Sequence, residues 1–162
     1  MKRRLLLIPA AIVAVFLDAF VFPTVSGNGI RPLFTMSLAL AATASTKVQD
    51  GILIALFGGI LTDLFCNPYV GLSAAAYLVA VMILYGFTHK GGQRRILLIP
   101  FALVGAVAAE TMIFVFSLAI GARFDVHRLL TATLPSVVPE ALLVYPLAAV
   151  FRSREKGSSV HK

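Results

Sequence analysis

Six apolar runs, separated by short polar or turn-forming segments, limit what this chain can fold into. They cover residues 5–22, 31–46, 51–65, 70–88, 96–121 and 129–151. A transmembrane helix needs about 20 mainly apolar residues, so six such helices nearly exhaust a chain of 162 residues. We predict an all-α integral membrane protein: a polytopic bundle of about six transmembrane helices, forming one domain over residues 1–151. Residues 152–162 are expected to be a polar, disordered cytoplasmic tail.

The composition agrees with a surface that faces lipid. Hydrophobic residues make up 59% of the chain, charged residues only 13%, and the mean hydropathy is +0.94, which is far above the values of water-soluble domains. The net charge of +7 does not indicate nucleic-acid binding, because the basic residues lie between apolar runs and form no separate basic face. Membrane lipid is therefore the expected partner of this surface.

The distribution of Lys and Arg predicts the topology, because cytoplasmic loops are enriched in both. With six spans, both termini are cytoplasmic, and only Arg31, Arg123 and Arg128 of the 14 basic residues lie outside. The second run, diluted by Ser and Thr, is the weakest span. Leaving it out would place nine basic residues outside and five inside, against the positive-inside rule, so six spans are preferred.

Four acidic residues fall within the apolar runs, where each costs on the order of 3 kcal/mol near the bilayer centre. Asp18 and Asp63 lie near the ends of their runs, and we expect their carboxylates to reach the headgroups. Glu110 and Glu140 lie close to mid-span and are the stronger functional candidates. Helical spacing is expected to turn both glutamates toward protein.

The surroundings of the two glutamates leave three roles open. Glu140 shares a helix face with Ser136 and Thr133, and Glu110 shares one with Ala106 and Ser117. Each carboxyl could be a hydrogen-bonded packing residue, a contact to a partner helix, or part of a proton or ion path.

A stripe of small residues in the third run predicts a helix-packing seam. Gly51, Ala55, Gly59 and Asp63 recur every four residues and allow another backbone to approach closely. The seam could serve packing within the bundle or contact with another protein.

Three prolines interrupt the last run. Pro135, Pro139 and Pro146 each remove a helical hydrogen bond, so we expect this helix to be kinked or broken around Glu140. Broken membrane helices often line cavities.

Nothing in the sequence indicates catalysis. The histidines His89, His127 and His161 lie between runs or in the tail, and Cys66 is the one cysteine. No nucleophile motif, phosphate-binding glycine loop or metal-binding spacing occurs. We therefore expect no enzyme activity, no cofactor and no metal site.

The segment GGILTDLFCNPYVGLSAAAYLVAVMILYG at residues 58–86 resembles the signature region of the rod shape-determining protein MreD family. In that family a glycine-bearing helix ends in Asp-Leu, a short loop with Pro follows, and Gly-Leu opens a helix rich in Ala and Tyr. The matching positions are Gly59, Asp63, Leu64, Pro68, Gly71, Leu72, Ala75 and Tyr77. Elsewhere the resemblance is one of architecture only, and Glu110 and Glu140 match no family motif.

The resemblance implies a non-catalytic membrane scaffold of the bacterial cell-elongation machinery, located in the inner membrane. Such a scaffold binds the single-span protein MreC and the membrane glycosyltransferase and transpeptidase that build peptidoglycan, and it is linked to MreB filaments. The sequence leaves a homodimer open.

The same family is similar in fold to the substrate-binding subunits of energy-coupling-factor vitamin transporters, which supplies the main alternative. That alternative predicts a deep pocket with convergent polar groups. A small proton-coupled carrier that uses Glu110 and Glu140 is a third reading, although no inverted repeat supports it.

Overall fold

A computed structural model describes residues 2–21, 33–45, 47–66, 69–90, 98–119 and 134–159. Every element in this part of the chain is helical, so the all-α prediction is confirmed there. The elements are α1 (Lys2–Phe16), the π-helical turn η1 (Leu17–Val21), α3 (Phe34–Ser45), α4 (Val48–Cys66), α5 (Leu72–Lys90), α6 (Leu98–Ala119) and α8 (Leu134–Ser159). Within the described residues, each of the six apolar runs overlaps one of these α-helices.

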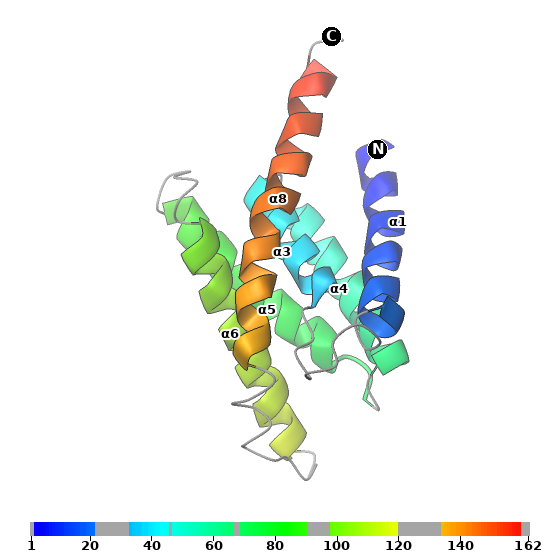
Figure 1. Ribbon diagram of the computed structural model, residues 1–162, viewed down its shortest axis with the longest axis vertical. Helices are drawn as coiled ribbons and strands as arrows, with labels where there is room; N and C mark the ends of the chain where they lie inside the picture. The colour runs from blue at the N-terminus through cyan, green and yellow to red at the C-terminus, as the bar shows by residue number, and fades with distance from the viewer. Residues whose placement is uncertain are drawn as a thin grey trace.

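The six α-helices run alternately in opposite directions (Figure 1). The beginning of α1 and the end of α8 consequently lie at the same end of the bundle. Neighbouring helices along the chain pack on one another from α3 to α6, and α8 packs on both α3 and α6. This antiparallel order is the one expected for helices joined by short connections.

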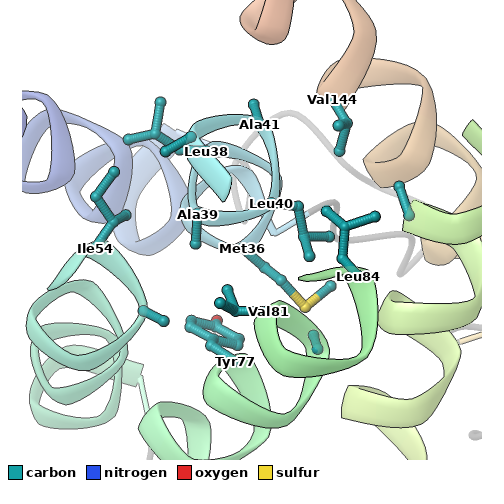
Figure 2. Close-up of a cluster of buried hydrophobic side chains, with 14 of the residues drawn as sticks. Met36, Leu38, Ala39, Leu40, Ala41, Ile54, Tyr77, Val81, Leu84 and Val144 are labelled. Carbon is teal, nitrogen blue, oxygen red and sulfur yellow. The ribbon is translucent and has the colours of Figure 1, made fainter. Parts of the chain in front are cut away.

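Helix α3 lies at the centre of the bundle and contacts α1, α4, α5 and α8. Its sequence, FTMSLALAATAS, is almost entirely buried. Figure 2 shows the apolar cluster around it, with Ile54 from α4, Tyr77 from α5 and Val144 from α8 directed toward the α3 side chains. Small residues allow several helices to approach one backbone closely, which explains why this run is diluted in large apolar residues.

The described helix of the second run is shorter than a complete span. It has 12 residues and a length of about 18 Å at 1.5 Å per residue, against a hydrocarbon core of about 30 Å. The span expected over residues 31–46 stays a prediction, because residues 31, 32 and 46 lie outside the described part of the chain.

The small-residue seam on α4 is occupied by other helices of the bundle. A Cβ added at Gly51 would collide with Thr43 of α3, and one added at Gly59 would collide with the backbone of Ala74 in α5. Ala55 and Asp63 on the same stripe are fully buried. Gly51, Ala55, Gly59 and Asp63 thus serve contacts within the protein.

The last helix was expected to be kinked or broken around Glu140, and the break is wrong, because α8 runs without interruption from Leu134 to Ser159. The kink stays a prediction. Pro135 falls in the first turn, where its missing N–H has no helical partner in any case. Pro139 and Pro146 lie within the helix without ending it; prolines are tolerated in membrane helices. The tail expected to be disordered continues the helix over residues 152–159, and α8 extends beyond the other helices at that end (Figure 1).

The outer surface of the bundle is apolar on α1, α4, α5, α6 and α8. Exposed side chains include Val13, Phe57, Met82, Val104 and Leu142, one from each of these helices in turn. Among the side chains that the structure describes, Lys47 is the one exposed charged residue. The acidic side chains in the same part of the chain are buried.

Two helical segments, Val48–Cys66 and Ile99–Phe116, are long and apolar enough to cross a membrane. The other four apolar segments, within the residues described, are shorter: Leu7–Val21, Phe34–Ser45, Leu72–Phe87 and Ser136–Phe151.

We expect Gly59→Ala to destabilise the bundle by about 1–3 kcal/mol, because the added methyl group would collide with the Ala74 backbone. The matched control is Gly86→Ala on α5, where an added Cβ meets no atom within 4 Å. That change should be neutral or stabilising by up to about 1 kcal/mol through helix propensity. Thermal unfolding in detergent measures both. Equal stability of the two variants would contradict the close α4–α5 contact.

Candidate functional site

The N-terminal end of α3 is capped by carboxyl groups from two other helices. Leu33 is the N-cap residue, since its carbonyl oxygen accepts the first helical hydrogen bond from Ser37 N–H at 3.1 Å. A leucine has no side-chain oxygen with which to cap the free N–H groups of the first turn. Those N–H groups lie inside the bundle and need acceptors from elsewhere.

Asp18 supplies two of the acceptors. It lies in the π-helical turn that ends the first helix. Its Oδ1 accepts a hydrogen bond from Phe34 N–H at 2.7 Å, and its Oδ2 accepts one from Thr35 N–H at 2.8 Å. A carboxylate at a helix N-terminus also interacts favourably with the helix dipole. The expectation that Asp18 reaches the headgroups was therefore wrong, because it is buried and both its oxygens are used inside the protein.

Glu140 of α8 supplies the third acceptor and lies 107 residues after Leu33 in the chain. Its Oε1 accepts a hydrogen bond from Leu33 N–H at 3.0 Å. The backbone carbonyl oxygen of Glu140 accepts a hydrogen bond from the Ser37 hydroxyl at 3.1 Å. The side chain is fully buried. Asp18 and Glu140 thus hold the first turn of α3 from two sides.

Three buried oxygen atoms near this turn complete no hydrogen bond: Thr35 Oγ1, Tyr77 Oη and Glu140 Oε2. The Tyr77 hydroxyl, from α5, lies within electrostatic interaction range of Asp18, Glu140 and Glu110. Glu110, from α6, is 8% exposed and also interacts electrostatically with Glu140. We call Asp18, Thr35, Tyr77, Glu110 and Glu140 the interior polar cluster. Its five residues come from η1, α3, α5, α6 and α8, in that order.

A second carboxylate uses the same capping arrangement at the start of α5. Gly71 is the N-cap of α5 and has a φ of 100°, which favours glycine. Asp63, at the end of α4, accepts hydrogen bonds from Gly71 N–H at 2.8 Å and from Ser73 N–H at 3.0 Å. Asp63 is fully buried, so it does not extend to the headgroups as expected from its place near the end of the run.

The segment that carries the family resemblance is therefore one structural unit, the α4–α5 helical hairpin. Gly59 permits the helices to approach, Asp63 caps α5, and Tyr77 is fully buried. Leu64 is exposed, whereas Leu72 and Ala75 are half-buried. Pro68 lies outside the described residues.

Glu110 and Glu140 both point into the protein, as their helical spacing predicted. The structure also brings them into one cluster, which the sequence did not predict. Ser136 and Ala106, on their helix faces, are buried. Thr133 and the side chain of Ser117 lie outside the described part of the chain.

Sequence reasoning missed that Asp18 and Thr35 belong to the same cluster, and it named Tyr77 only through the resemblance. A usable signal was present. Leu33 and Gly71 both begin helices without a capping side chain, and an acidic residue stands at the end of the helix before each of them.

The cluster offers carboxyl and hydroxyl groups, which hold protons and accept or donate hydrogen bonds. No grouping of three or more His, Cys, Asp or Glu side chains suited to a metal ion occurs within the described residues. Proton or hydrogen-bond chemistry is thus what these side chains can provide.

Comparison with known proteins gave no further assignment. No protein-family model, no curated protein and no solved structure matches this chain.

Asp18→Ala should destabilise the protein by about 2 kcal/mol or more, because it leaves the Phe34 and Thr35 N–H groups buried without an acceptor. Asp18→Asn keeps one side-chain oxygen and should cost less. The control is Thr111→Ala, which removes an exposed hydroxyl that donates within its own helix. Circular dichroism during heating in detergent measures the thermal stability of the three variants and of the wild type. An Asp18→Ala protein as stable as wild type would show that this cap is not formed.

Proposed function

We propose that this protein crosses the bacterial inner membrane six times, with both termini in the cytoplasm. The observation that carries this proposal is the distribution of polarity: the described surface is apolar on five helices, while the acidic groups lie inside. Water-soluble proteins show the reverse arrangement, with charged residues almost never fully buried. The alternating helix directions and the shared end of α1 and α8 suit an even number of crossings.

Helix α3 fits such a topology although it is short. Its polar N-terminal end is capped inside the protein, and non-spanning or irregular backbone is tolerated at membrane depth when protein surrounds it.

We further propose that the protein is a non-catalytic scaffold of the cell-elongation machinery, which binds an MreC-like single-span protein and the membrane peptidoglycan synthases. The resemblance at residues 58–86 supports this assignment, and those residues form the α4–α5 hairpin. The apolar outer faces of five helices offer surface on which partner transmembrane helices can pack.

The substrate-binding subunit of a vitamin transporter is the second candidate. It is favoured by one observation, the unpaired polar atoms of Tyr77 and Glu140 in the interior, since ligand sites contain a few convergent polar groups among apolar ones.

Affinity purification of the tagged protein from native membranes in mild detergent distinguishes the scaffold from the transporter subunit. The tag is placed after α8. The scaffold function predicts recovery of a periplasmic single-span protein together with cell-wall synthases. Recovery of ATPase subunits or of a bound vitamin would contradict it and support the transporter function.

Photocrosslinking should locate the partner surface. A photoreactive amino acid placed in turn at Val13, Phe57, Met82, Val104 and Leu142 samples one exposed position on each outer helix. We expect protein adducts from one or two neighbouring helices and lipid adducts from the others, because a single-span partner covers only one face. The absence of protein adducts at all five positions would count against a helix-binding scaffold.

A further inference from the structure

The interior polar cluster contains more acid than its surroundings neutralise. Asp18, Glu110 and Glu140 would together carry three negative charges. The N-terminus of α3 offers roughly +0.5 of an elementary charge. Lys47, the one basic side chain described, is exposed and follows the opposite end of α3. An isolated buried carboxylate is so costly that the neutral form replaces it.

The hydrogen bonds of Asp18 and Glu140 differ in a way that separates an ionised carboxylate from a protonated carboxyl group. Both oxygens of Asp18 accept N–H groups, which suits an ionised carboxylate. Glu140 accepts one N–H at Oε1, while its Oε2 is fully buried and unpaired. A proton on Oε2 would remove the charge and leave the bond from Leu33 N–H intact. Two carboxyl groups in one site can hold opposite protonation states in this way.

The Tyr77 hydroxyl is a second unpaired group of the interior polar cluster. It is fully buried, completes no hydrogen bond and interacts electrostatically with Glu140. Thr62 of α4 also lies near this hydroxyl. The Thr62 hydroxyl donates to the Gly58 carbonyl oxygen at 2.9 Å and still has lone pairs that can accept a hydrogen bond.

We propose that Glu140 is a proton-binding site inside the bundle and that it carries its proton on Oε2. The groups that face it are the Leu33 N–H and the Ser37 hydroxyl at the start of α3, Asp18 from η1, Tyr77 from α5 and Glu110 from α6. Asp63 of α4 is engaged at the start of α5. The site does not depend on the scaffold function.

Infrared spectroscopy of the full-length protein in lipid vesicles tests this proposal. A protonated carboxyl group has a C=O stretch separate from the carboxylate bands, and the stretch shifts in D₂O. We expect this band in the wild type, its loss in Glu140→Gln, and its persistence in the matched variants Glu110→Gln and Asp18→Asn. The band should disappear reversibly as the pH is raised.

Three results would overturn the proposal. They are absence of the band in wild type, its persistence in Glu140→Gln, and its loss on adding sodium ions at constant pH, which would indicate a cation site. If Glu140→Gln does not fold, Tyr77→Phe carries the test, because it removes the hydroxyl that interacts electrostatically with Glu140 and leaves Glu140 in place. The band must then shift in position, and an unshifted band overturns the proposal.

Discussion

The capping of α3 by Asp18 and Glu140 is the interaction on which this architecture depends. The helix is short, lies among the others and presents free N–H groups to the interior of the bundle. Water cannot satisfy those groups there, and each unpaired group would cost about 1–3 kcal/mol. The carboxyl groups that satisfy them come from near the beginning and near the end of the chain. The first, second and last helical runs are thereby fixed to one another at a single point.

Around this point the polar groups lie inside the bundle and apolar side chains cover its outer surface. Small side chains on α3 and glycines on α4 bring the helices close, and many large apolar side chains of the other helices face outward. Lipid is the solvent that suits such a surface. The carboxyl groups of Asp18, Asp63 and Glu140 pair with backbone N–H groups at two helix starts. The Thr35 and Tyr77 hydroxyls and one oxygen of Glu140 complete no hydrogen bond. These unpaired atoms mark the interior polar cluster as the place where function other than packing is to be sought.

Much of the fold could be predicted from the apolar runs, because burial in lipid requires continuous apolar helices. The sequence also placed Glu110 and Glu140 in the interior. It did not predict the roles of Asp18 and Asp63, because distance from the end of a run reports depth in the membrane and not which backbone groups lie nearby. Nor did it predict the unbroken α8, since whether Pro139 and Pro146 interrupt a helix depends on the surrounding packing.

Labelling from opposite sides of the membrane tests the central claim, that α4 and its neighbours cross a bilayer. In a Cys66→Ser background, Lys47→Cys and Tyr69→Cys place single cysteines at exposed positions before and after α4. A membrane-impermeant maleimide should label Tyr69→Cys in intact spheroplasts and Lys47→Cys only after lysis. Labelling of both positions from the same side would contradict the account.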